Sequence, residues 1–322
     1  MKTNKLLLIF LCIPLLIFSV SACGGKNDEK KKVAVIVKAL DSDFWQSVKN
    51  GVDAAATEYN VNVTFDGPEN EEDYENQNNL ITAAAENGAD AIVLSAIDFE
   101  KNTEAVNAAA EKGIPVIMID SNVSSGKVSM FIGTDNEAAG RMAGEAAVGC
   151  ISDGEKINIG LINYYKSTEN GMQRENGFRS YIDGIANADI TAAVNVNSNT
   201  ESVASAVTAI LEENSNINVL VGFNEWMTLG IGKAIQQLGL KGQVYAVGFD
   251  ANTTSVGMIE TGEINTLIVQ NPFAIGYLGV QNAVKLSSGE HAVQKEVYTD
   301  AVAVKRSNLF DRDIQKMVFR FN

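Results

Sequence analysis

The chain has few of the side chains on which catalysis, metal binding and covalent cross-linking depend. Its 322 residues include three cysteines, four prolines and a single histidine, His291. Without a second histidine, a cysteine pair, or the motifs G-x-S-x-G and G-x-x-x-x-G-K-[ST], the usual groups of catalytic triads, zinc sites and nucleotide-binding loops are missing. Paired carboxylates could still carry out acid–base chemistry, as they do in glycosidases. The composition therefore favours a protein that is not an enzyme and that holds no cofactor or metal.

Basic side chains are also scarce relative to acidic ones. The chain has 25 lysines and arginines against 40 aspartates and glutamates, which gives a formal net charge of −15. Residues 1–22 contain two lysines and no acid, so their removal leaves a charge of −17. Such a surface repels nucleic acids and anionic lipid headgroups. We therefore expect no nucleic-acid partner.

Residues 1–22 have the layout of a secretory signal peptide. Two lysines precede an apolar stretch at 6–18, which is too short for a confident membrane span and is followed by small residues. The segment VSAC at 20–23 resembles the lipobox of bacterial lipoproteins, in which the cysteine becomes the lipid-bearing first residue of the mature chain. We expect lipidation at Cys23, a polar tether at 23–32, and a lipid-anchored protein on the outer face of a bacterial membrane. A signal peptide cleaved without lipidation is the alternative.

The cysteines allow no internal disulfide bond in the mature chain. Cys12 lies in the signal peptide and Cys23 at the lipidation site, which leaves Cys150 alone. We expect Cys150 to be a buried residue at the end of a helix, and the stability of the fold to come from packing.

Beyond residue 32 the chain alternates short apolar runs with alanine-rich helical patterns. This order is typical of an α/β protein with doubly wound parallel sheets, and about 300 residues are enough for two lobes. The expected strands are 33–37, 62–65, 91–95, 115–119, 129–132, 157–162, 191–196, 219–223, 244–247 and 266–269. A strand-like stretch at 297–304 would complete both sheets. The expected helices are 44–59, 74–86, 101–112, 136–149, 169–185, 201–214, 225–238, 253–260 and 274–287.

The first strand and helix, within 33–51, form the unit around which a ligand site is expected. Ligands of open α/β sheets bind beyond the carboxyl ends of the strands, and Phe44 and Trp45 stand at this turn. Aromatic rings at the start of a helix more often face the core, so packing is the alternative role for both.

Several motifs in this order resemble the periplasmic sugar-binding proteins of the ribose and galactose type, which are solute receptors of ABC importers. The resemblance covers about 270 residues. The matching motifs are Phe44-Trp45, Ile119-Asp120, Thr134-Asp135-Asn136, Arg174 with Gly177-Phe178, Asn224 with Met227 and Gly230, Val247-Gly248-Phe249-Asp250, and Gln270-Asn271-Pro272.

The resemblance implies two lobes of the type I periplasmic binding protein fold, joined by a hinge of three crossings that closes on the ligand. The crossings would fall near Thr134, Gln270 and Thr299. We then expect an N-terminal lobe of 33–134 with 271–299, and a C-terminal lobe of 135–270 with 300–322. The resemblance also implies a monomer that delivers its ligand to an ABC permease.

A sugar site needs aromatic rings against the C–H faces and polar side chains around the hydroxyl rim. Phe44 and Trp45 would stack on the ring, and the two carboxylates would accept hydrogen bonds from hydroxyls. Each candidate has an alternative role: a loop or capping carboxylate for the two aspartates, a helix cap for Asn224, and a hinge residue for Gln270. The candidate ligand-binding residues are Ser42, Phe44, Trp45, Asp120, Ser121, Tyr164, Met172, Asn224, Trp226, Asp250 and Gln270.

The sequence departs from the ribose-type pattern where that pattern carries two arginines. Ser121 and Met172 stand in their place, while both carboxylates remain, so we expect a cleft more acidic than a ribose site. Arg174 matches a more structural arginine of the family. The aromatic wall of the second lobe stays open between Tyr164, Tyr165 and Trp226, each of which could be an ordinary packing residue.

We expect the ligand to be a small neutral sugar or polyol, with an amino sugar or an amine as the alternative. A sensor for a membrane chemotaxis or kinase receptor would need the same cleft as a transport protein. A regulator related to the lac repressor would need a basic helix-turn-helix before the first strand, where this chain has a signal peptide and tether instead.

Overall fold

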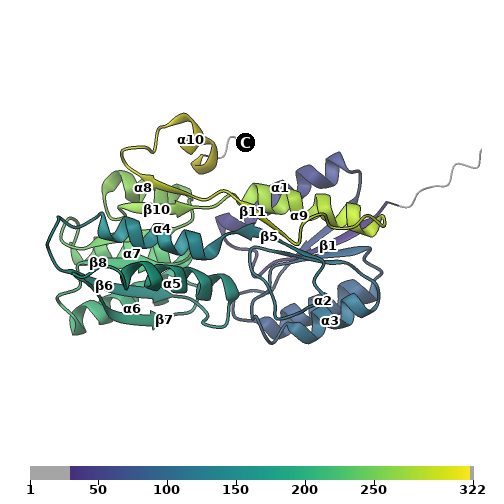
Figure 1. Cartoon of the computed structure of the whole chain (residues 1–322), viewed down its shortest axis with the longest axis horizontal. Coiled ribbons are helices and arrows are strands. Elements are labelled where there is room, and N and C mark those ends of the chain that lie inside the picture. Colours follow the sequence, from purple (N-terminus) through teal and green to yellow (C-terminus); the bar gives the residue numbers. More distant parts are fainter. Residues whose placement is uncertain (1–29, 320–322) are drawn as a thin grey trace, which may run out of the picture.

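The computed structural model describes residues 30–319. Within these residues the chain forms two α/β lobes side by side, with helices on both faces of each central sheet (Figure 1). The expected signal peptide, Cys23 and most of the expected tether lie outside the described residues. No helix of the described part is long and apolar enough to span a membrane.

The first lobe contains a six-stranded sheet in the order β11-β5-β4-β3-β1-β2, in which every pairing is parallel. Its strands are β1 (Lys32–Ile36), β2 (Asn62–Asp66), β3 (Ala91–Leu94), β4 (Val116–Ile119), β5 (Met130–Thr134) and β11 (Glu296–Thr299). Its helices are α1 (Asp43–Glu58), α2 (Tyr74–Glu86), α3 (Thr103–Glu111) and α9 (Pro272–Ser287).

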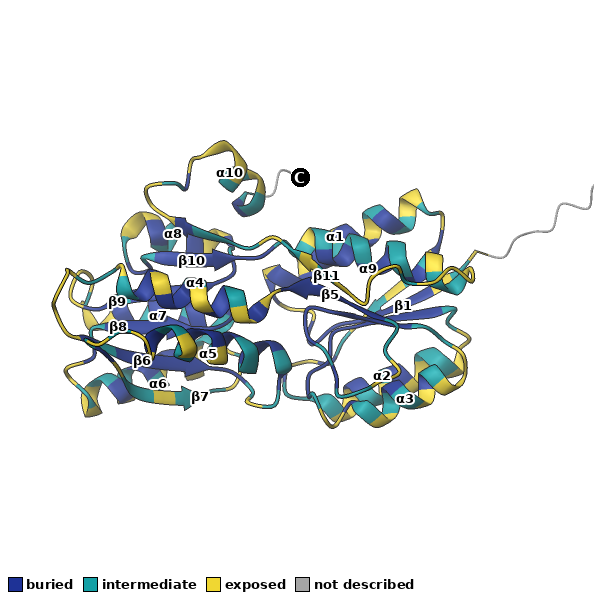
Figure 2. Cartoon of the chain, viewed as in Figure 1, coloured by how far each residue is buried: buried dark blue, intermediate teal, exposed yellow. Residues whose placement is uncertain are grey.

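Alternation along β1 gives this lobe a core on each face of the sheet. Val33 and Val35 pack with residues of α1 and α9, while Ala34 and Ile36 pack with residues of α2 and α3. A central parallel strand is buried on both faces, so it reads as a continuous apolar run, as the sequence indicates for 33–37. Figure 2 shows the resulting buried strands between helices that are exposed only on their outer sides.

The second lobe contains a six-stranded sheet in the order β12-β10-β9-β8-β6-β7. Its strands are β6 (Ile157–Asn163), β7 (Ala188–Asn195), β8 (Val219–Gly222), β9 (Tyr245–Phe249), β10 (Thr266–Val269) and β12 (Val302–Lys305). Its helices are α4 (Asn136–Val148), α5 (Glu169–Ile182), α6 (Thr200–Glu213), α7 (Glu225–Leu238), α8 (Thr253–Thr261) and α10 (Arg312–Val318).

The chain passes between the lobes three times, which confirms the expected hinge. The crossings follow β5, follow β10, and separate β11 from β12. The strand-like stretch 297–304 completes both sheets as expected, because the third crossing divides it into β11 and β12. One pairing also departs from the parallel pattern, since β12 runs antiparallel to β10. The exact lobe boundaries stay a prediction.

Two details of secondary structure also differ from the sequence analysis. The strand expected at 191–196 begins earlier, at Ala188, and the short helix α10 near the carboxyl end was not expected. Cys150 follows α4 as expected but is only partly buried, and its thiol lies 3.3 Å from the Ala146 carbonyl oxygen.

Helices α1 and α9 are held together by the close approach of their backbones. A Cβ atom on Gly51 would lie 2.0 Å from the carbonyl oxygen of Phe273, and one on Gly276 would lie 2.1 Å from that of Val48. Only glycine fits at such contacts. This packing fixes the position of α1, whose first turn faces the other lobe.

Candidate ligand-binding site

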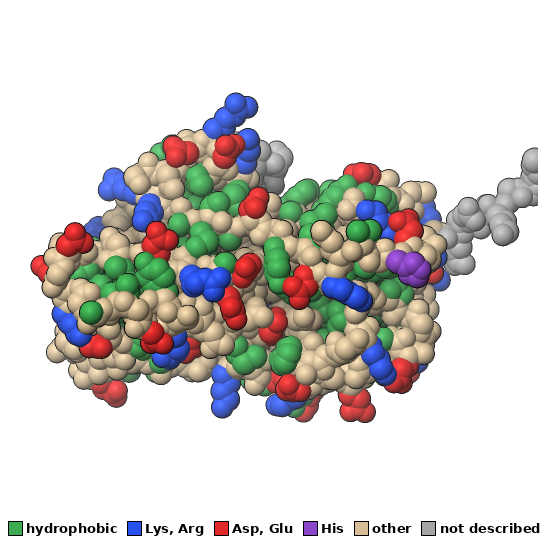
Figure 3. Space-filling model, viewed as in Figure 1, with side chains coloured by type: hydrophobic (Ala, Val, Ile, Leu, Met, Phe, Trp, Pro, Cys, Tyr) green, Lys and Arg blue, Asp and Glu red, His purple; other side chains and the backbone are tan. Residues whose placement is uncertain are grey.

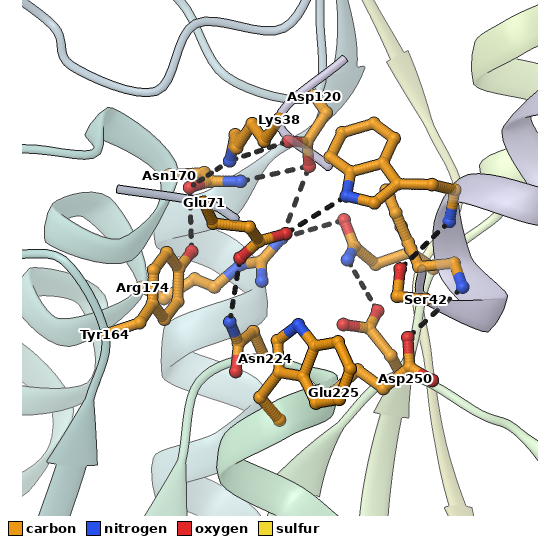
Figure 4. A pocket seen from close by; sticks show the side chains of 14 residues that line it. Lys38, Ser42, Glu71, Asp120, Tyr164, Asn170, Arg174, Asn224, Glu225 and Asp250 are labelled. Atoms are coloured by element: carbon orange, nitrogen blue, oxygen red, sulfur yellow. Dashed lines mark hydrogen bonds and ion pairs between the residues drawn. The ribbon is translucent and has the colours of Figure 1, made fainter. Parts of the chain in front are cut away.

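A small cavity of about 30 Å³ lies between the two lobes. Such a volume holds about one or two water molecules, so the lobes are closed on each other. The cavity lies at the carboxyl ends of strands from both sheets, where ligand sites of open α/β folds occur. Its lining (Figure 4) consists of Lys38, Ser42, Phe44, Trp45, Glu71, Asp120, Tyr164, Asn170, Arg174, Asn224, Glu225, Trp226, Asp250 and Gln270.

The aromatic pair at the start of α1 belongs both to the cavity and to the core. Ser42 caps the helix by accepting a hydrogen bond from the backbone N–H of Trp45, which aims the first turn at the cleft. The rings of Phe44 and Trp45 meet edge to face, with 4.9 Å between their centroids. Trp45 is only 1% exposed, and its indole N–H donates to Oε1 of Glu71 at 3.0 Å. Both rings therefore pack in the core and also line the cavity.

Asp120 lies at the end of β4 and has a left-handed backbone, with φ of 58°. Its carboxylate is surrounded by donors: Lys38 Nζ at 2.9 Å, the Ser95 hydroxyl at 2.9 Å and the Asn170 amide at 3.0 Å. Asn170 comes from the opposite lobe, so this carboxylate takes part in closure. Lys38 provides the cation beside Asp120, a role for which the sequence analysis named no residue.

Arg174, on α5, is held rigidly at the floor of the cavity. Its guanidinium donates to the Asn136 side chain at 2.8 Å, to the Phe223 carbonyl oxygen at 2.7 Å and to Oε1 of Gln270 at 2.9 Å. The carbon at its centre lies 4.7 Å from the centroid of the Phe249 ring. Arg174 is 1% exposed. These contacts agree with a structural arginine, yet they also bring its positive charge to the cavity.

Asp250 follows β9 and also has a left-handed backbone, with φ of 67°. Its Oδ1 accepts a hydrogen bond from the Gln270 amide at 2.7 Å. Burial raises the pKa of Asp250 from 3.8 to about 7, although Arg174 and the hydrogen bond from Gln270 oppose the rise. Gln270 is held in turn by the Thr134 hydroxyl, which donates to its Oε1 at 2.8 Å. Hydrogen bonds through Gln270 therefore connect Thr134, at the first crossing of the hinge, with Asp250.

Asn224 and Glu225 stand at the start of α7. Asn224 caps this helix by accepting from the N–H of Met227 at 2.9 Å, and its amide also lies 3.5 Å from Oε2 of Glu71. Glu225 accepts from the backbone N–H of Phe44 across the cleft at 3.2 Å and from the Asn252 amide at 2.6 Å. Burial raises the pKa values of both Glu71 and Glu225. The cap assigned to Asn224 does not remove it from the cleft.

The second lobe contributes Tyr164 and Trp226 to the aromatic part of the lining. The hydroxyl of Tyr164 donates to Oδ1 of Asn170 at 2.7 Å. Tyr165 does not line the cavity, because its hydroxyl donates to Asp98 at the rim, at 2.9 Å. Of the three aromatic candidates left open by the sequence, two therefore lie at the site.

Two candidate residues do not line this cavity. Ser121 is fully buried behind it and its hydroxyl has no hydrogen-bond partner, while Met172 is half-buried on α5. Four lining residues were not named from the sequence: Lys38, Glu71, Asn170 and Glu225. Lys38 had a signal, because it interrupts an apolar run directly after β1. Glu71 stands in a loop with three other acids, and nothing in the sequence distinguished it from them.

The rest of the described chain offers no competing catalytic or metal centre. His291 is exposed, and Figure 3 shows it on the first lobe, far from the boundary between the lobes. Within residues 30–319, no group of three His, Cys, Asp or Glu side chains is placed to hold a metal ion.

The amino-acid sequence of this chain matches a known protein family. The family model for the periplasmic binding protein domain matches residues 33–291, most of the chain. The chain belongs to this family. Its members are solute-binding proteins of transport systems, so this periplasmic binding protein is not an enzyme.

Individual relatives agree with this assignment. The ribose import binding protein of Haemophilus influenzae is 28% identical over 290 residues, which cover 87% of this chain and 93% of the relative. A carbohydrate transporter solute-binding protein of Agrobacterium radiobacter, solved with D-arabinose, has a TM-score of 0.87 and 28% identity, covering 90% and 99% of the two chains. An ABC transporter solute-binding protein of Agrobacterium vitis, solved with D-fucose, has a TM-score of 0.86 and 31% identity, covering 89% and 100%.

Proposed function

We propose that this protein captures a small sugar or polyol between its lobes, outside the cytoplasmic membrane, and delivers it as a monomer to an ABC importer. The observation that carries the proposal is the set of side chains that line the cavity between the lobes. Trp45 from one lobe and Trp226 from the other offer apolar ring faces, and carboxylates, amides and cations surround them. This combination suits a ring with apolar faces and a rim of hydroxyls.

Closure of the hinge would follow binding to one lobe. The ligand first meets Phe44, Trp45 and Asp120 in the open cleft, and the rotation of the second lobe then adds Asp250 and Gln270. Closure excludes water, which strengthens each polar contact in the less polarisable surroundings. The contacts that Asn170 makes with the first lobe, to Lys38 at 3.2 Å and to Asp120 at 3.0 Å, support closure at this site because they require both lobes to be together.

The proposal includes a lipid anchor at Cys23. The variant Cys23→Ser should appear in the soluble fraction, whereas the unchanged protein should sediment with membranes. Retention of the variant on membranes after a salt wash would contradict the lipid anchor and leave the sugar-binding proposal untouched.

The binding function is tested by thermal denaturation of the purified protein against pentoses, hexoses, polyols, amino sugars and nucleosides. A ligand present at a hundred times its dissociation constant stabilises the folded state by about 2.7 kcal/mol, which raises the melting temperature by several degrees. Stabilisation by a sugar or polyol is the expected result. If nucleosides alone stabilise the protein, or if no compound of the panel does, the proposed function is wrong.

A further inference from the structure

The formal charges around the cavity are unbalanced. Its lining includes four carboxyl side chains but only two basic ones, Lys38 and Arg174. Both basic groups are already engaged: Lys38 lies 2.9 Å from Asp120, and Arg174 donates to three neighbouring oxygens. The remaining acids, Glu71, Glu225 and Asp250, have no Lys or Arg nitrogen of the described residues within 4.0 Å.

The three acids without a cation differ in how their oxygens are satisfied. Glu225 receives a hydrogen bond on each oxygen, from the Phe44 N–H and from the Asn252 amide. Asp250 receives one on Oδ1 only, and the described residues place no donor on its Oδ2. Glu71 receives a good hydrogen bond on Oε1, while its Oε2 has only the Asn224 amide at 3.5 Å. Two carboxylates therefore keep acceptor capacity for a ligand.

These two carboxylates are buried and reach into one pocket. Glu71 is 9% exposed and Asp250 is 7% exposed, and they come from opposite lobes. Figure 4 shows both side chains extending into the pocket. The two tryptophans line the same pocket, and indole faces attract cations as well as sugar C–H groups. Buried carboxylates and aromatic rings that line one pocket make a setting that favours an ammonium group over a hydroxyl.

We propose that the sugar or polyol carried by this protein bears a protonated amine, and that Glu71 and Asp250 hold its ammonium group when the lobes close. The inference rests on the proposed function and narrows its ligand class. A neutral sugar would leave the excess negative charge of the closed cleft uncompensated, whereas an ammonium group offsets it and supplies three donors. Burial raises the pKa values of both acids in the closed state and outweighs the opposing charges of Lys38 near Glu71 and Arg174 near Asp250.

The test compares each amine with its neutral counterpart by isothermal titration calorimetry on the full mature protein. The probes are 2-amino, 3-amino and 6-amino hexoses and 1-amino polyols, each paired with the parent sugar or polyol and with the N-acetyl derivative. We expect at least one amine to bind ten times more tightly than both of its neutral counterparts. A neutral sugar that binds as tightly as any amine overturns this inference and leaves the proposed function standing. If no probe binds, both fail.

Variants then connect the preference to the two carboxylates. Asp250→Asn keeps the shape of the side chain, and asparagine tolerates the left-handed backbone at this position. Glu71→Gln likewise keeps the shape and size. Each should reduce the affinity ratio of amine to neutral counterpart at least tenfold.

Glu225→Gln is the matched control, because it removes the same charge from the same cavity at a carboxylate whose oxygens are already occupied. Glu225→Gln should weaken the binding of the amine and of its neutral counterpart by similar factors. The exposed Glu75→Gln should change neither. An unchanged ratio in Asp250→Asn, or an equal fall in Glu225→Gln, would show that these two carboxylates do not hold the amine.

Discussion

The empty protein should open as the pH rises from about 4 to 7, because closure buries the Asp250 carboxyl group and burial disfavours its charged form. The carboxyl group faces Arg174 and Gln270, which favour its charged form, and Glu225 and Asp120, which disfavour it. Burial outweighs the favourable partners and raises the pKa from 3.8 to about 7. The closed form therefore prefers the protonated acid.

The sign and size of the effect follow from proton linkage. Below about pH 4 the side chain is protonated whether the cleft is open or closed, so the closed form carries no penalty from it. Between pH 4 and 7 the solvated carboxyl ionises while the buried one retains its proton, and closure becomes steadily less favourable. At 1.36 kcal/mol for each pH unit, the full penalty above pH 7 is about 4 kcal/mol. Separation of the lobes hydrates Asp250 without unfolding either lobe, so we expect opening rather than denaturation.

Intrinsic fluorescence is well placed to follow this change. The chain has two tryptophans, and both line the cavity. Between pH 5 and 8 their emission should move to longer wavelengths, and the radius of gyration from small-angle X-ray scattering should increase. In Asp250→Asn both changes should be smaller, with the remainder due to Glu71 and Glu225, whose pKa values are also raised. The reasoning is refuted if the wild-type protein keeps one radius of gyration over this range, or if the variant follows the wild-type profile.

Two further substitutions test the fold and the buried ion pair. Gly51→Ala should destabilise the protein by about 1–3 kcal/mol in urea denaturation, because its Cβ would collide with the Phe273 carbonyl oxygen. Gly257→Ala, with open space around its Cβ in α8, should be neutral or slightly stabilising, and an equal loss in both would contradict the packing argument. Lys38→Met should disfavour closure by about 3–5 kcal/mol by leaving Asp120 without its nearest cation, measured as a larger radius of gyration. Adding Asp120→Asn should restore part of the closure. If closure is not restored, the loss of the ion pair is not the cause of the opening.

Much of the fold can be read from local patterns. Runs such as 33–37 predict buried parallel strands because each face of the sheet is covered, and the helical patterns between them predict the covering layers. Breaks in local periodicity are harder to predict. The run 297–304 shows no break in its local pattern, and only the family resemblance divides it near Thr299, where the hinge passes from β11 to β12.

The sequence determined which strand ends would carry polar and aromatic groups. Phe44, Trp45, Asp120, Asp250 and Gln270 follow strands, and parallel strands bring their carboxyl ends to one edge, so these residues were expected together and do line the cavity. Ser121 and Met172 stand where the family pattern carries two arginines, and this loss of positive charge also indicated an acidic cleft.

Only the tertiary structure decided how the charges are balanced. Lys38 is 82 residues from Asp120 in sequence, and Glu71 meets Asn224 across 153 residues. The first contact arises from the folding of one sheet and the second from the docking of the two lobes, and no local pattern encodes either. Ser121 and Met172 occupy the expected sequence positions but lie outside the lining, because whether a side chain enters a cleft depends on the direction of its Cα–Cβ bond and on closure. Sequence position therefore identified the edge of the sheet, and packing between the lobes selected the side chains that form the site.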